Sequence, residues 1–179
     1  FDNNATTRVA PEVLEAMLPY LKDFYGNPSS MHAFGGQVAV RVRRAREQVA
    51  ALLGAQPDEI FFTSCGTESD NAAIRSALLQ APEKRHIVTS RVEHPAVKAL
   101  CADLASRGYR VTELPVDTEG RLDLDQYRRS LTPDTAVVSL MWANNETGVI
   151  FPVIEAAQIA REMGVLFHTD AVQAVGKIP

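Results

Sequence analysis

The sequence has few of the features that mark a secreted, membrane-spanning or nucleic-acid-binding protein. Its two cysteines, Cys65 and Cys101, are too few for a disulfide framework, which favours a reducing, cytoplasmic location. No apolar run approaches the ~20 residues of a membrane span, and no signal-peptide pattern opens the chain. The net charge of -4 gives no electrostatic attraction to nucleic acids or anionic membranes, so we expect neither as a partner.

Internal repeats, low-complexity tracts and an evident linker are also absent, and 179 residues are enough for one domain with a substantial core. The chain begins at Phe1 directly before a polar motif and stops at Pro179 without a finishing helix or cap. We therefore expect a segment of a longer protein. Expressed alone, such a segment should expose an apolar sheet edge and aggregate.

Helical spacing of apolar residues predicts two helices near the start. One begins at about Pro11, and the other runs from about Val38 to Gly54, which ends it. Short apolar runs then alternate with helical stretches, which indicates an α/β fold with a mostly parallel sheet and helices on both faces. The predicted strands are 60–63, 86–92, 110–116, 135–142 and 165–169; the predicted helices between and after them are 67–80, 95–107, 123–131 and 153–163.

The stretch 165–174 ends an apolar run in polar residues and is typical of a fully buried strand followed by a ligand-binding tip. Asp170 would lie at this tip. A buried carboxylate is costly unless it meets a cation or several donors, so Asp170 should face a cation.

The turn before the 67–80 helix offers a second polar site. Gly66 lets the backbone approach a ligand, and the free N–H groups of the helix, with the Thr67 hydroxyl, suit an anion. The alternative is an ordinary capped helix, with Ser64 or Thr67 as N-cap and Glu68 in the first turn. The spacing matches neither a Walker loop nor a dinucleotide fingerprint, so a nucleotide is not favoured.

Further polar residues follow two other predicted strands. His94 lies in the loop before Pro95, and Asn144 and Asn145 lie in a loop that ends at Gly148. Each cluster alone could be an exposed histidine or a simple turn. Four clusters at strand ends carry more weight, because open α/β sheets bind ligands there.

Other candidates favour structural explanations. Cys101 falls on an apolar helical stripe, and Cys65 is interpreted as a packing residue rather than a nucleophile. A metal site from His94, His168 and Asp170 lacks the spacing of known ligand sets, so no metal is predicted. Four arginines are interpreted as a solvated helix face rather than a phosphate patch: Arg41, Arg43, Arg44 and Arg46.

An acid facing a cation, an anion-binding turn, amides and a loop histidine together suit pyridoxal phosphate (PLP). This cofactor has a pyridinium nitrogen, a phosphate and a ring oxygen. It also needs a lysine that binds it covalently. None of the four lysines follows a strand-end cluster in a suitable way: Lys22, Lys84, Lys98 and Lys177.

Six ordered motifs resemble the amino-terminal half of the cysteine desulfurases, fold-type I PLP enzymes, and look most like their nitrogen-fixation (NifS-like) branch. The motifs are D-N-N-A-T-T at 2–7, G-N-P-S-S-M-H at 26–32, T-S-C-G-T-E-S-D at 63–70, E-H-P-A-V at 93–97, N-N-E-T-G at 144–148 and H-T-D-A-V-Q at 168–173. The resemblance implies an N-terminal segment and helix (1–25) followed by a PLP-binding large domain (26–179), cut before the cofactor lysine.

The resemblance also implies a role for each matched residue. Gly66 and Thr67 would hold the phosphate, and His94 would stack on the pyridine ring and move protons. Asp170 would pair with the pyridinium nitrogen, while Asn145 and Gln173 would contact the ring oxygen. Three residues would lie near the substrate entrance: Asn3, Asn4 and His32.

The implied activity is conversion of L-cysteine to L-alanine by a homodimer. Sulfur would pass as an enzyme persulfide to an iron–sulfur scaffold protein for nitrogenase cluster assembly. The covalent lysine and the persulfide cysteine would lie beyond Pro179, so the segment alone should be inactive. Alternatives are a selenocysteine lyase or a small aminotransferase of the same fold, or an inactive fragment that binds a cofactor or partner.

Overall fold

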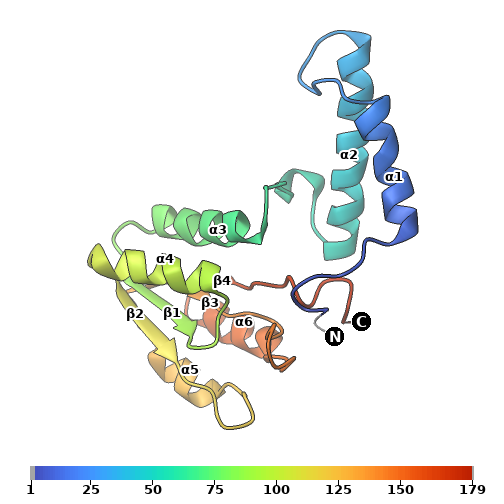
Figure 1. The fold of residues 1–179 in the computed structure, drawn as a ribbon. Helices are drawn as coiled ribbons and strands as arrows, with labels where there is room; N and C mark the ends of the chain where they lie inside the picture. The colour runs from blue at the N-terminus through green and yellow to red at the C-terminus, as the bar shows by residue number, and fades with distance from the viewer. Residues whose placement is uncertain (1–2, 179) are drawn as a thin grey trace. The chain divides into compact units, whose positions relative to one another are not determined.

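The computed structural model describes residues 3–178 (Figure 1). The chain divides into two compact units, an amino-terminal unit up to Phe62 and a sheet unit from Thr63 onward. The domain boundary predicted after residue 25 stays a prediction. Among the described residues, no helix is both long and apolar enough to cross a membrane. The helices are α1 (Pro11–Lys22), α2 (Ala33–Leu53), α3 (Gly66–Gln80), α4 (Pro95–Ser106), α5 (Leu124–Ser130) and α6 (Val153–Glu162), with a short 3-10 helix, η1 (Pro57–Glu59).

The sheet unit is built on a four-stranded parallel sheet with the order β2-β1-β3-β4. The central strands β1 and β3 are buried along their whole length, as expected where helices cover both faces of a parallel sheet. A helix separates each strand from the next along the chain, which confirms the predicted alternation. The strands are β1 (His86–Ser90), β2 (Arg110–Leu114), β3 (Thr135–Ser139) and β4 (Leu166–His168).

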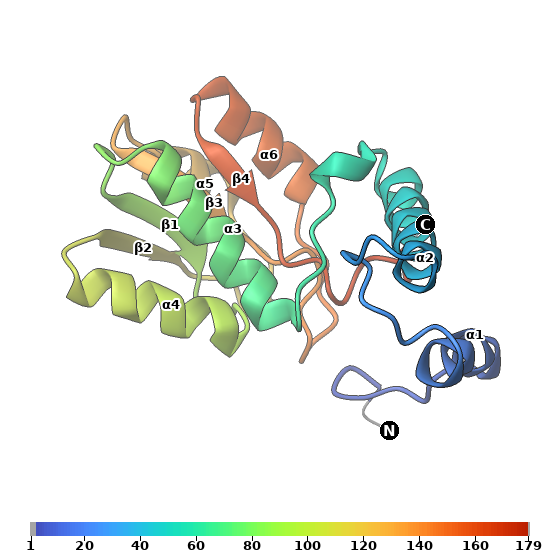
Figure 2. The ribbon, with the colours of Figure 1, turned by 90° about the horizontal axis from the view of Figure 1, so that it is seen from above.

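Helices α3 and α4 cover one face of the sheet, and α5 and α6 cover the other (Figures 1 and 2). Neighbouring strand residues point to opposite faces, so Ile87 joins the α3/α4 core while Val88 joins the α5/α6 core. Cys101 is buried in the α3/α4 core, as predicted. Burial of each large apolar side chain contributes roughly 1.5–3 kcal/mol, so these two cores hold the sheet unit together.

Two of the predicted strands differ from the structure. Residues 60–63 form no strand, because the chain there follows η1 and leaves Phe61 and Phe62 82% and 52% exposed. Strand β4 is not fully buried. It pairs only with β3 and is therefore the edge of the described sheet, which leaves Leu166 44% exposed.

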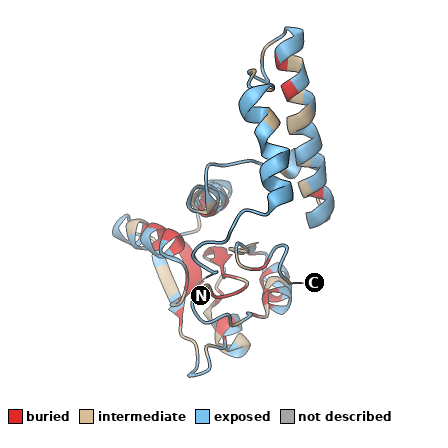
Figure 3. Cartoon of the chain, turned by 45° about the vertical axis from the view of Figure 1, so that its right-hand side comes forward, coloured by how far each residue is buried: buried red, intermediate tan, exposed pale blue. Residues whose placement is uncertain are grey.

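The amino-terminal unit contains α1, α2 and η1, and few of its side chains are buried (Figure 3). Helix α1 begins at Pro11 as predicted and contains no buried residue. Helix α2 ends at Gly54, which has a φ of 67°; this left-handed conformation suits glycine and confirms the predicted end. The apolar stripe predicted for α1 is exposed to solvent in this chain: Leu14, Met17, Leu18 and Leu21.

At the amino edge of the sheet, where its strands begin, His86 is completely buried between two threonines. Its Nδ1 lies 2.8 Å from Thr135 Oγ1, and its Nε2 lies 2.9 Å from Thr112 Oγ1. Burial, assisted by the positive charge of Arg110, lowers the pKa of His86 to about 4. The imidazole is therefore neutral near pH 7 and joins β1 to both of its neighbours.

Candidate cofactor site

Four loops meet at the carboxyl edge of the sheet, where the strands end, and contacts between them form a closed ring. The Trp142 N–H donates to Asp170 O at 2.9 Å, which joins the loops after β3 and β4. Asn144 Nδ2 donates to Val92 O at 3.1 Å, which joins the loops after β3 and β1. The next two contacts bring in the start of α3, so all four polar clusters predicted from the sequence belong to one site.

The start of α3 closes the ring on both sides. The Asn71 side-chain amide donates to Thr67 O at 2.9 Å and to Ala96 O at 3.4 Å, so α3 is tied to the start of α4. A Cβ built on Gly66 would lie 3.4 Å from Val172 Cγ2, so the same turn touches the loop after β4. The turn at Gly66 therefore lies beside the loop that contains Asp170.

The α3 N-terminus retains the donors that an anion needs. Thr67 is exposed, and its hydroxyl makes no hydrogen bond within the described residues. The N-cap is Cys65, whose side chain makes no capping hydrogen bond, so the prediction of Ser64 or Thr67 as N-cap was wrong. The Glu68 carboxylate lies in the first turn as expected but accepts from the Ser64 N–H and hydroxyl, at 2.7 and 2.6 Å, instead of from the helix.

Cys65 is exposed, so its interpretation as a packing residue was wrong. It lies at the start of α3, where its Sγ accepts from the Ser64 hydroxyl at 3.7 Å. The Glu68 backbone N–H and the Ser64 hydroxyl favour the thiolate and lower the pKa of Cys65 below its usual value.

His94 lies between β1 and α4 and is the N-cap of α4, with Pro95 as the first helical residue. Its Nδ1 accepts from the Ala96 N–H at 3.2 Å, which leaves Nε2 to carry the hydrogen of a neutral ring. The ring is exposed and lines the same groove as Thr67 and Asn71. The structure therefore brings the predicted ring-stacking residue beside the predicted phosphate-binding residue.

The loop after β3 contains two asparagines with different environments. Asn144 is buried, and its Oδ1 accepts from the backbone N–H groups of Glu146 and Thr147 and from the Thr147 hydroxyl, so it organises the turn. Asn145 is half-buried, and its Nδ2 donates to Glu146 Oε1 at 2.9 Å. The turn that Asn144 builds thus presents Asn145 at the ring.

Asp170 follows β4 and is half-buried. Its Oδ1 accepts from the Val172 N–H at 3.0 Å, and no protein cation lies within ion-pair distance among residues 3–178. Gln173 lies one turn further on and accepts from the Lys177 ammonium. The predicted partner cation of Asp170 is therefore not supplied by the described part of the chain.

A buried polar network lies next to this loop. His168 Nε2 lies 3.5 Å from Asp70 Oδ1, and its Nδ1 lies 2.9 Å from Ser139 Oγ. Asp70 is only 5% exposed and comes from α3. This network joins α3, β3 and β4 directly before Asp170.

Three predicted substrate residues belong to the amino-terminal unit, and their role stays a prediction. Asn3 and Asn4 are exposed in a turn before α1. His32 is the N-cap of α2, where its Nδ1 accepts from the Gly35 N–H at 3.2 Å.

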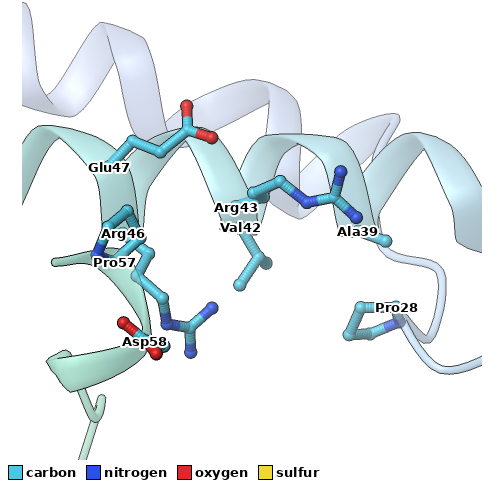
Figure 4. A pocket seen from close by; sticks show the side chains of 8 residues that line it. All are labelled: Pro28, Ala39, Val42, Arg43, Arg46, Glu47, Pro57 and Asp58. Carbon is cyan, nitrogen blue, oxygen red and sulfur yellow. The ribbon is translucent and has the colours of Figure 1, made fainter.

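The arginines of α2 do not converge on one anion site. The Arg41 guanidinium lies 3.6 Å from the Phe24 ring centroid, whereas Arg46 donates from Nε to Ile60 O at 3.0 Å. A shallow hollow between α2 and η1 (Figure 4) is lined by Arg43 and Arg46 together with the acidic Glu47 and Asp58. Mixed charge of this kind agrees with a solvated helix face.

The sequence model of one family, described as aminotransferase class V, matches residues 1–179. The chain belongs to the aminotransferase class-V family. Enzymes of this family depend on PLP. The match covers the whole chain, so it includes both compact units and all four loops of the ring.

Curated class-V relatives confirm the resemblance to cysteine desulfurases and its nitrogen-fixation branch. The chain is 64% identical over 178 residues to a cysteine desulfurase of Nostoc sp. (strain PCC 7120). It is 60% identical over 179 residues to cysteine desulfurase NifS of Azotobacter vinelandii. Each alignment covers 99% of this chain but 44% of the relative, so the chain spans less than half the length of these proteins.

Solved structures confirm the fold-type I assignment. A NifS-like protein aligns with a TM-score of 0.96 and 43% identity, over 100% of this chain and 50% of the other. The structure titled "SspA in complex with cysteine" aligns with a TM-score of 0.93 and 38% identity, over 97% of this chain and 50% of the other.

Sequence reasoning singled out polar residues at this edge of the sheet but missed several that hold the loops together. No role was predicted for Asn71, Asn144 or Glu93, although each is a polar residue next to a predicted site residue. For Glu93 no signal of burial existed in the sequence, because a glutamate after a strand is ordinarily exposed.

Proposed function

We propose that this chain is the cofactor-binding half of a PLP-dependent cysteine desulfurase. The observation that carries the proposal is the closed ring of loops at the carboxyl edge. It gathers an anion-binding helix start, an exposed imidazole, an amide and a carboxylate that has no ion-pair partner among residues 3–178. A likeness of 60–64% to named cysteine desulfurases supports the choice among PLP enzymes.

The residues present fit the proposed cofactor. Thr67 offers a hydroxyl with no hydrogen bond in the described residues, and the α3 N-terminus favours a phosphate charge. Asp170 has no ion-pair partner among these residues and suits a protonated ring nitrogen. Thr169 Oγ1, next to Asp170 in the chain, is buried and has no hydrogen-bond partner in the described part of the chain, which is the kind of donor a bound ligand satisfies.

Each residue would then have one task. When bound, PLP withdraws electrons from the α-carbon of an amino-acid substrate. Asp170 would keep the ring nitrogen protonated, and Gly66 and Thr67 would hold the phosphate. His94 would cover the ring and move a proton at Nε2, because its Nδ1 accepts from Ala96. Asn145 and Gln173 would hold the ring oxygen.

The proposed reaction takes L-cysteine to L-alanine and leaves the substrate sulfur on an enzyme cysteine as a persulfide. The Cβ–S bond of cysteine would break as an S–S bond forms between that sulfur and the enzyme sulfur. The electron pair of the broken bond would stay on Cβ, which would take up a proton equivalent to the one lost by the enzyme thiol, so cysteine and the enzyme thiol give alanine and S–SH. The covalent lysine and the thiol would come from residues outside this chain. A cysteine-bound structure among the structural relatives supports cysteine as the substrate.

We further propose a cytoplasmic homodimer that passes sulfur to an iron–sulfur scaffold protein for nitrogen fixation. The likeness to NifS of Azotobacter vinelandii supports this role. The exposed apolar stripe of α1, in which Leu21 is 73% exposed and Met17 51% exposed, supports association between copies.

The test is borohydride reduction of the full-length protein from its native source, followed by peptide mass mapping. We expect a pyridoxyl group on one lysine outside residues 1–179. A native product that ends at Pro179 and carries no adduct would contradict the enzyme proposal and leave a binding role. Turnover of L-cysteine and L-selenocysteine by the same preparation would separate a desulfurase from a selenocysteine lyase.

A further inference from the structure

The two residues before His94 are clamped to the extension of β3. Val92 O accepts from Asn144 Nδ2 at 3.1 Å, and Glu93 Oε1 accepts from the Met141 N–H at 3.0 Å. The next N–H along the chain, that of Trp142, donates in turn to Asp170 O. Residues 141–142 therefore join the loop of His94 on one side to the loop of Asp170 on the other.

The Glu93 side chain is the central part of this clamp, and its environment is poor for a charge. The residue is 4% exposed. Its Oε1 accepts from the Ser90 hydroxyl at 2.6 Å as well as from Met141, whereas its Oε2 is buried without a hydrogen-bond partner among the described residues. Burial raises the pKa of Glu93 to about 7, and the negative charge of Asp170 acts in the same direction.

Charged groups around Glu93 do not compensate for this burial. From the β4 side, Asp170 opposes a charge on Glu93 and His168 favours one. A groove that Glu93 also lines presents the cations Arg91 and Lys98 and the anions Asp117, Glu119 and Glu146. Within residues 3–178, none of these cations forms an ion pair with Glu93.

We propose that Glu93 is a positioning residue that acts in its neutral, protonated form. In this form it holds the loop of His94 against β3 and adds no negative charge beside Asp170. The effect of Glu93 on catalysis rests on the proposed function, whereas the protonation of Glu93 does not. Burial already disfavours a charge on Glu93, and the nearby Asp170 carboxylate adds like-charge repulsion, so the neutral form of Glu93 avoids both costs.

The first test reads the proton directly, in the full-length protein freed of cofactor. Infrared difference spectra between pH 5 and pH 9 should contain a protonated-carboxyl C=O band that is lost as pH rises through about 7. Glu93→Gln should remove this band. The matched control Glu113→Gln changes an exposed carboxylate on β2 and should leave it intact. A spectrum in which Glu93→Gln removes no titrating band overturns the inference.

The second test reads positioning in the loaded enzyme. Glu93→Gln keeps both acceptor contacts of Oε1, so below pH 7 we expect its kcat to be within about twofold of the wild-type value. If the kcat of the wild type falls with a midpoint near pH 7, the kcat of Glu93→Gln should not fall there. Glu93→Asp shortens the side chain and should lower kcat at least tenfold at every pH. If Glu93→Gln is as impaired as Glu93→Asp, or if Glu93→Asp matches wild type, the neutral positioning role is wrong.

The two proposals fail in different ways. An intact infrared band with no pyridoxyl-labelled lysine would contradict the proposed function alone. A labelled lysine without a titrating Glu93 band would contradict this inference alone.

Discussion

Strand β1 has a buried titratable side chain at each end, and the structure surrounds the two side chains differently. His86, at the amino edge, places each ring nitrogen within 3 Å of a threonine hydroxyl. Glu93, three residues past the carboxyl end, satisfies one oxygen and leaves the other buried without a partner. Burial favours the neutral form of both.

This difference in hydrogen bonding indicates that the amino end of β1 serves stability and that the residues past its carboxyl end serve function. The His86 cluster is saturated, so nothing there remains to bind a ligand. At the carboxyl edge, the groups that lack partners in the described chain are the ones that a ligand could satisfy. Open α/β sheets bind ligands at the carboxyl ends of their strands, and the buried polar groups that lack partners among the described residues lie toward that edge.

The largest effect that would sharpen the comparison is on catalysis. Asp170→Ala in the full-length protein should lower kcat by roughly 10²- to 10³-fold, because a preorganised charge is lost, while much of the cofactor stays bound. Asp134→Ala, at the amino edge, removes an acceptor for the Arg85 N–H and is the matched control, with kcat unchanged. Near-normal turnover of Asp170→Ala would remove the role assigned to Asp170.

The second prediction concerns His86 at the amino edge, where a substitution should lower stability and leave catalysis unchanged. His86→Ala should lower the free energy of unfolding by about 2–4 kcal/mol, because it leaves a cavity and two buried hydroxyls without their partner. The kcat per folded molecule should not change. Urea unfolding and active-site titration measure the two quantities. If His86→Ala lowered kcat without lowering stability, the amino edge of the sheet would serve catalysis, which contradicts the assignment of the site to the carboxyl edge.

The third prediction concerns pH. The folded pKa of His86, about 4, lies below its ordinary 6.5, so the native state binds fewer protons and stability falls as pH drops through this window. The folded pKa of Glu93, about 7, lies above its ordinary 4.5, so stability falls as pH rises through that window. Each effect amounts to at most on the order of 3 kcal/mol.

Between about pH 4.5 and 6.5 the two effects oppose each other, so each variant should reveal the other group. In the cofactor-free full-length protein, the urea midpoint of Glu93→Gln should rise with pH across this interval, and that of His86→Gln should fall. Equal pH profiles for the two variants would show that these groups do not titrate as the structure indicates.

The smallest predicted effect lies away from both edges. The Tyr127 hydroxyl is buried and donates to Ala156 O at 2.9 Å, joining α5 to α6. Tyr127→Phe should cost about 0.5–1.5 kcal/mol in unfolding free energy and leave kcat unchanged. A loss of activity in this variant would mean that the α5/α6 layer also shapes the site.

Local pattern predicted the elements of the sheet unit well because apolar runs and helical spacing are local signals. It assigned a strand to residues 60–63, where Phe61 and Phe62 lack a neighbouring strand, because pairing is not a local signal. For the same reason it gave β4 a buried environment, although Leu166 lies at an edge.

The site divides in the same way. Residues that follow strands, such as His94 and Asp170, could be found because strand ends are visible in the sequence. The clamp could not be found, since Glu93 meets Met141 across 48 residues and Asn144 meets Val92 across 52. Its distances depend on the folded sheet rather than on any spacing in the sequence.

The most direct test of the account is hydrogen exchange of the full-length protein with and without PLP, read by peptide. We expect added protection in the peptides that contain residues 64–70, 92–96, 141–147 and 168–173. We expect none in the peptides that contain residues 84–86, 110–112 and 132–135, where the sheet begins. Protection at the amino edge, or none at the four carboxyl-edge loops, would contradict the assignment of the site.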